Sequence, residues 1–135
     1  MNKQSALEWL KKAYHDLTSA EILYRANHYT DSIGVDLHYA IEKSLKSFLA
    51  FQNKKISKTH DLPELYELVN DFIELEEDEV LYVANKYHVE MSYPHFDRQL
   101  PSRNEIKVVL EFTQELFIKV CKKLDITQEN IIDTN

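Results

Sequence analysis

Cysteine, glycine and proline are scarce in this sequence, which contains one, one and three of them in 135 residues. A single cysteine excludes an intrachain disulfide and any zinc cluster built on cysteines. Because all-β folds and dinucleotide-binding folds use glycine in turns and phosphate loops, the low glycine content indicates long helices joined by few turns. No apolar run approaches the length of a membrane span, and the first residues lack the apolar segment of a signal peptide. We therefore expect one cytoplasmic domain.

Motifs for the commonest catalytic chemistries are also missing. The sequence contains no P-loop, no GxGxxG, no GxSxG and no HExxH. Cys121 lies beside an apolar stripe, where a buried thiol is usually inert. His38 and Glu42 are four residues apart on one expected helix face and could share an ion, but the sequence has no second pair of this kind. We favour a hydrogen bond on the helix surface or an interface role for them, and we expect no metal and no cofactor.

The net charge of −7 is distributed unevenly along the chain. Residues 1–60 carry nine basic and six acidic groups, whereas residues 61–90 carry ten acidic groups and only Lys86 as a basic one. The average field of the protein repels nucleic acid, so it is not a general binder of polyanions. A local basic site in the first half, including the loop with Lys54, Lys55 and Lys58, stays compatible with this pattern.

Apolar residues recur at helical spacing through most of the chain. Three predicted helix starts have capping-box spacing: Ser5 with Glu8, Asp61 with Glu64, and Ser102 with Glu105. Thr30 or Asp31 is expected to cap the second helix, Pro63 fits a first helical turn, and Gly34 indicates a close crossing of two helices. The expected helices cover about residues 5–27, 31–52, 61–73, 78–88 and 102–124.

These helices predict an all-α fold, an antiparallel up-and-down bundle of four or five helices joined by short loops. The bundle is expected to span residues 1–125. A polar tail follows over 126–135, in which Ile131 and Ile132 could dock. The longest irregular stretch, "EMSYPHFDRQLPSR", contains Pro94 and Pro101, and loops of this length are often functional.

Two loops carry residue types suited to phosphate chemistry. Cleavage of RNA without a metal needs a general base, a general acid and a cation near the reacting phosphate. If the two loops meet, these roles could be filled by Lys58, His60, His95, Arg98 and Arg103. Lys43 and Lys46 could contact phosphate from the second helix, although Glu42 and Lys46 also have the spacing of an ordinary i,i+4 ion pair.

Four segments of the chain together resemble small prokaryotic HEPN-domain proteins. They are "EWLKKAYHDLTSAEILY", "YTDSIGVDLHYAIEKSLKSFLAF", "KTHDLPEL", and "YP" before the last amphipathic helix. The resemblance covers about residues 5–124. It implies a helical bundle, a homodimer, and pairing with a small nucleotidyltransferase, often as toxin and antitoxin. It also implies either nucleotide binding, a non-catalytic role, or metal-independent ribonuclease activity through an R-x4-6-H motif.

The sequence departs from that ribonuclease pattern. Arg25 is followed by His28, which is too close, and neither Arg98 nor Arg103 is followed by a histidine. Where many relatives read R-Y-P, this chain reads Ser-Tyr-Pro over 92–94. No catalytic residue is therefore assigned, and whether the chain is an enzyme stays open.

The expected function is a nucleotide- or RNA-binding and protein-interaction module. An endoribonuclease with an atypical site and a purely structural dimeric module are the alternatives. The candidate ligand-binding residues are Lys43, Lys46, Lys58, His60, Tyr93, His95, Arg98 and Arg103. His60 is expected to order its loop through a side-chain hydrogen bond and to lie near the 90–102 segment.

Overall fold

The computed structural model describes residues 1–89, 94 and 99–132, and within these residues it contains five α-helices and no strand. The all-α prediction is confirmed. The elements are α1 (Lys3–Arg25), α2 (Thr30–Phe51), α3 (Leu62–Val69), α4 (Glu79–Val89), α5 (Arg103–Lys123) and a short 3₁₀ helix, η1 (Gln128–Asn130).

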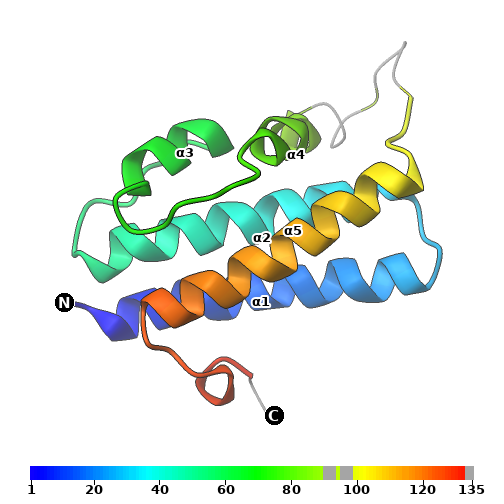
Figure 1. The fold of residues 1–135 in the computed structure, drawn as a ribbon. Coiled ribbons are helices and arrows are strands. Elements are labelled where there is room, and N and C mark those ends of the chain that lie inside the picture. The colour runs from blue at the N-terminus through cyan, green and yellow to red at the C-terminus, as the bar shows by residue number, and fades with distance from the viewer. Residues whose placement is uncertain (90–93, 95–98, 133–135) are drawn as a thin grey trace.

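Three long helices form the body of the molecule, and two short ones lie over α2 (Figure 1). α1 runs antiparallel to both α2 and α5. At one end Lys3 lies 3.6 Å from Asp125, and at the other Arg103 donates to the carbonyl of Tyr24 at 2.9 Å. Because α3 and α4 carry the chain back along α2, α5 runs in the same direction as α2 (Figure 1).

The structure confirms two of the predicted helix starts. Asp61 accepts a hydrogen bond from the backbone N–H of Glu64 at 3.0 Å, and Ser102 accepts one from Glu105 at 3.1 Å. Pro63 lies in the first turn of α3. However, α3 ends at Val69, which is earlier than expected, and Ile73 is buried from the turn that follows.

The predicted caps of the first two helices are wrong. Asn2, not Ser5, caps α1, because its side chain accepts from the N–H of Ser5 at 3.0 Å and the helix begins two residues earlier. α2 begins at Thr30 after Tyr29, which makes no side-chain cap hydrogen bond. The Asp31 carboxylate bonds only to the next residue's N–H, so burial of the helix face rather than capping defines this start.

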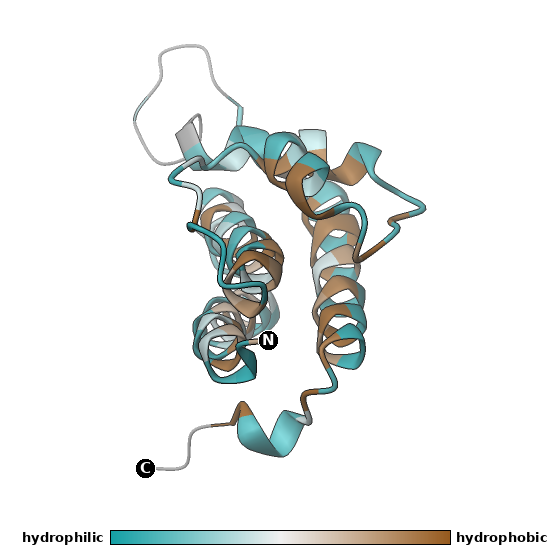
Figure 2. Cartoon of the chain, turned by 90° about the vertical axis from the view of Figure 1, so that its left-hand side faces the viewer, coloured by the Kyte–Doolittle hydropathy of each residue, from teal (hydrophilic) through white to brown (hydrophobic). Residues whose placement is uncertain are grey.

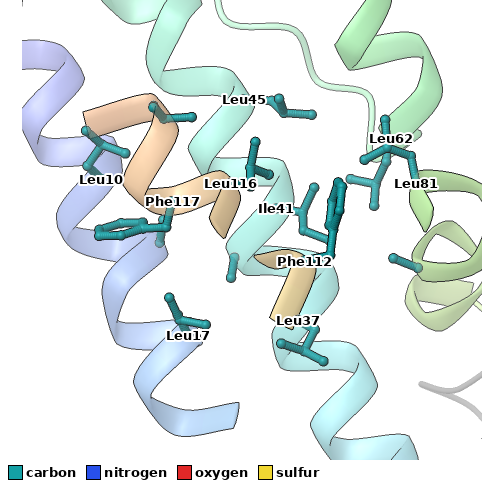
Figure 3. Packing of buried hydrophobic residues seen from close by; sticks show 14 of the residues in the cluster. Leu10, Leu17, Leu37, Ile41, Leu45, Leu62, Leu81, Phe112, Leu116 and Phe117 are labelled. Carbon is teal, nitrogen blue, oxygen red and sulfur yellow. The ribbon is translucent and has the colours of Figure 1, made fainter. Parts of the chain in front are cut away.

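The hydrophobic core lies between the three long helices and continues under α3 and α4. Each long helix carries hydrophobic and hydrophilic segments along its length (Figure 2). α2 is central and contacts each of the other four α-helices. Figure 3 shows the packing of side chains from all five: Leu10, Leu17, Leu37, Ile41, Leu45, Leu62, Leu81, Phe112, Leu116 and Phe117. Since α2 is covered on most sides, several of its polar residues, among them His38, Glu42 and Lys46, are also buried.

The close crossing expected at Gly34 is confirmed. A Cβ atom at this position would lie 3.0 Å from two ring atoms of Tyr87 on α4, closer than ordinary van der Waals contact. The Tyr87 ring cannot easily move away, because its hydroxyl donates to Glu105 on α5 at 2.6 Å. Glycine therefore lets α4 approach α2 directly.

The chain after α5 packs back onto the bundle. Ile126 and Ile131 are buried and belong to the hydrophobic core, so the docking expected of Ile131 is confirmed. Ile132 is about half exposed, and its expected docking is wrong.

Candidate functional site around His60

A row of polar residues follows one face of α2 at intervals of four. His38, Glu42 and Lys46 are 0%, 4% and 4% exposed. The helix-surface position expected for His38 and Glu42 is therefore wrong: the row faces the segment before α3 and the end of α4. Burial of two charged groups and an imidazole in a domain of this size is uncommon and requires partners for each.

The Glu42 carboxylate accepts hydrogen bonds from two side chains, Lys46 and His60. One oxygen accepts from Lys46 Nζ at 3.0 Å, and the other accepts from His60 Nδ1 at 2.8 Å. His38 Nδ1 lies 3.7 Å from the second oxygen. The expected pairing of Glu42 with Lys46 is confirmed, but its burial gives it an energetic role quite different from that of a surface pair.

His38 is held neutral inside the protein. Its Nε2 lies 2.8 Å from the carbonyl oxygen of His60, which can only accept, so Nε2 carries the proton. Burial lowers the pKa of His38 to about 4, against the opposing effects of this hydrogen bond and of Glu42. The neutral ring therefore fixes the backbone of residue 60 at ordinary pH.

His60 is anchored through both its backbone and its ring. Its carbonyl accepts from His38, its Nδ1 donates to Glu42, and its ring stacks on His88 with centroids 4.3 Å apart. About half of the side chain stays exposed. The loop-ordering hydrogen bond expected of His60 is confirmed. Its expected approach to Tyr93 lies outside the described residues.

His88 completes a column of three imidazoles. Its ring lies 4.9 Å from that of His38 and 4.3 Å from that of His60, centroid to centroid. Burial and the neighbouring His60 lower the pKa of His88. Asn85, one turn earlier on α4, accepts from the N–H of Leu62 at 2.9 Å and so ties the start of α3 to the same helix.

The other predicted residues are dispersed. Lys43 pairs with Asp16 on α1 at 2.7 Å, and Lys58 is exposed in the loop before α3. Arg103 packs on the Tyr24 ring and bonds its carbonyl, at the junction of α1 and α5. Tyr93, His95 and Arg98 lie outside the described residues.

Sequence reasoning missed His88, Asn85 and Trp9. His88 and Asn85 occupy α4 positions three residues apart, which places them on one face, but nothing local connects that face with His60. Trp9 on α1 lies with its ring centroid 6.0 Å from Lys46 Nζ. A polar row at i, i+4 and i+8 on an otherwise apolar helix is the signal that could have marked α2 as the centre of a site.

The arrangement can hold and transfer a proton. A carboxylate that accepts from Nδ1 of a histidine fixes its tautomer, and leaves Nε2 as a proton acceptor. In the part of the chain that the structure describes, no three His, Cys, Asp or Glu side chains are placed to hold a metal ion. None of the helices described there is long and apolar enough to cross a membrane.

Comparisons with known proteins show the family of the chain. The model of the HEPN domain matches residues 6–124. No match was found among the curated proteins. Among solved structures, TT1696 from Thermus thermophilus is similar in fold, with a TM-score of 0.74 and 23% sequence identity over 91% of this chain and 99% of that one. Since the family model spans most of the sequence, the chain belongs to the HEPN domain family.

Proposed function

We propose that this HEPN-domain protein is a nucleotide- or RNA-binding interaction module that acts as a homodimer in the cytoplasm. It would pair with a small nucleotidyltransferase in a system of the toxin–antitoxin type. The observation that carries the ligand-binding part is the anchoring of His60: one half-exposed imidazole is held by a buried carboxylate, a buried histidine and a stacked ring.

The need for a stable fold does not by itself explain the buried polar network around His60. Buried ion pairs are often matched or exceeded in stability by apolar residues of similar volume, because both charges must leave water. Glu42 and Lys46 form such a pair, and Glu42 also accepts from His60 Nδ1, whose side chain is about half exposed. We infer that the network serves to position the half-exposed His60 for a ligand.

The exposed basic residues of the loop that leads to His60 fit an anionic ligand. Lys58 is exposed two residues before His60, and two further exposed lysines, Lys54 and Lys55, precede it in the same loop. Phosphate groups attract such lysines, and imidazole faces and edges can stack on or bond to bases. The acidic 61–90 segment limits this attraction, so the expected binding is local and sensitive to salt.

Binding is tested with a short fluorescein-labelled RNA followed by fluorescence anisotropy at several salt concentrations in EDTA. We expect saturable binding by the wild-type protein. Lys58→Ala should reduce the slope of log affinity against log salt by about one, because one phosphate contact is lost. Lys119→Ala, which removes an exposed lysine on α5, is the matched control and should leave the slope unchanged. Absence of binding at low salt would contradict the ligand claim.

The partners are tested separately. Light scattering should give twice the mass of the 16.0 kDa chain at micromolar concentration. A strict monomer would contradict the homodimer. Co-expression with a small nucleotidyltransferase encoded beside the chain should yield one complex that co-elutes.

A second function is favoured by one observation, the hydrogen bond from His60 Nδ1 to Glu42. It leaves Nε2 able to accept a proton from a ribose 2′-hydroxyl, which makes metal-independent RNA cleavage the alternative function. If the alternative holds, RNA is cleaved in EDTA and His60→Ala lowers the rate by about 10²- to 10⁴-fold. His28→Ala, at an exposed histidine, should have no effect. RNA that stays intact with the wild-type protein would exclude this alternative.

A further inference from the structure

Trp9 forms one wall of an open pocket between α1 and α2. The pocket has a volume of about 230 Å³ and is lined by Glu8, Trp9, Lys12 and Lys43. Its apolar surface comes from the indole and from the aliphatic stems of the lysines. Pockets for drug-sized ligands have volumes of about 300–1,000 Å³, so this one suits a single flat ring.

The rim of the pocket carries ammonium groups. Lys12 is exposed, and within the described ranges no ion pair engages it. Lys43 Nζ lies 2.7 Å from the Asp16 carboxylate, with both side chains partly exposed. The Glu8 carboxylate interacts with other side chains of α1. It accepts from Gln4 Nε2 at 3.0 Å, and Lys11 Nζ lies 3.7 Å from the same oxygen. A flat ring bearing a phosphate therefore matches both the wall and the rim.

Lys46 connects this pocket with the His60 centre. Its Nζ lies 6.0 Å from the Trp9 ring centroid and 3.0 Å from the Glu42 carboxylate, which in turn accepts from His60. The pocket and His60 are thus linked through the interior of the protein, by the buried side chains of Lys46 and Glu42.

We propose that Trp9 is the base-stacking platform of the nucleotide site. A purine or pyrimidine ring lies on the indole, and the phosphate attached to its sugar is held by Lys12 and Lys43. An aromatic side chain can stack on any base, since every base has a π face. This proposal rests on the proposed ligand-binding function and assigns to it the residue that holds the base.

The chain contains a single tryptophan, so its intrinsic fluorescence reports on this pocket directly. Titration of the wild-type protein with AMP should quench this fluorescence to saturation. Ribose 5-phosphate, which carries the phosphate but no base, should leave it nearly unchanged. Equal quenching by the two compounds would overturn stacking in favour of a site for phosphate alone.

Variants of Trp9 test the same point with labelled RNA. Trp9→Ala should weaken anisotropy-measured binding by about 5- to 150-fold, which is the usual loss per stacked base. Trp9→Phe keeps a ring and should stay within several-fold of the wild type. Tyr82→Ala removes an aromatic ring on α4 that is more exposed than Trp9, and this variant should bind normally. Unchanged binding by Trp9→Ala would overturn the proposal.

The outcomes also distinguish failure of the Trp9 proposal from failure of the proposed ligand-binding function. Wild-type protein that binds RNA while AMP leaves the fluorescence unchanged, with Trp9→Ala binding equally well, refutes the platform and keeps the binding function. Wild-type protein that binds no RNA refutes both. If circular dichroism shows that Trp9→Ala is unfolded, the AMP titration of the wild type and the binding of Trp9→Phe decide the matter.

Discussion

Replacement of Glu42 by alanine is expected to lower the free energy of unfolding by about 3–5 kcal/mol. Lys46 is 4% exposed and would be left as a buried charge without its 3.0 Å partner. His60 would at the same time lose the acceptor of its Nδ1–H. The measurement is urea denaturation at pH 7, with the midpoint and slope compared between variant and wild type.

A double substitution separates the lost ion pair from lost packing. Glu42→Leu with Lys46→Met replaces both charges by apolar groups, and should recover most of the stability lost in Glu42→Ala. Glu8→Ala, which breaks an exposed pair with Lys11, should change the unfolding free energy by no more than about 1 kcal/mol. A loss in Glu42→Ala as small as that in Glu8→Ala would contradict the buried role of the pair.

Acid is expected to destabilise the fold between pH 6.5 and pH 4 through His38. The unfolded state binds a proton on this imidazole below about pH 6.5, whereas burial keeps the folded group neutral down to about pH 4. Stability from this group is therefore complete above pH 6.5 and is lost as pH falls through that window, by about 3 kcal/mol in total. The measurement is the unfolding free energy at closely spaced pH values.

Other titratable groups of the protein modify this pH profile. His88 also has a lowered pKa and adds to the loss in acid, whereas burial raises the pKa of Asp36, which acts in the opposite direction. His38→Gln keeps a neutral donor for the carbonyl of residue 60 and should flatten the profile between pH 6.5 and 4. His28→Gln, at an exposed position, should leave it as in the wild type. A profile that His38→Gln does not change would refute the assignment.

The parts of the fold that were predictable from the sequence are those that depend on near neighbours. Asp61 and Ser102 bond to N–H groups three residues away, and their spacing alone identified the starts of α3 and α5. Ser5 has the same spacing, but the residue that caps α1 is Asn2. The backbone N–H of Asn2 donates to the carbonyl of Phe51 at the end of α2. A contact over that sequence distance leaves no local pattern.

The candidate site was only partly predictable, for the same reason. Glu42 and Lys46 could be paired from their spacing, but their burial follows from the coverage of α2 by α3 and α4. The hydrogen bond between Glu42 and His60 spans 18 residues, and the stacking of His60 on His88 spans more. Such contacts depend on how helices pack, which periodicity does not specify.

The short lengths of α3 and α4 limit the lifetime of the His60 site. With eight and eleven residues, neither helix is long enough to be stable in water by itself, so each depends on contact with α2. His60 precedes α3, and His88 lies near the end of α4. Detachment of this pair of helices would dismantle the imidazole column while α1, α2 and α5 still held together. The lifetime of the site is therefore set by a local opening, whose free energy is smaller than that of global unfolding.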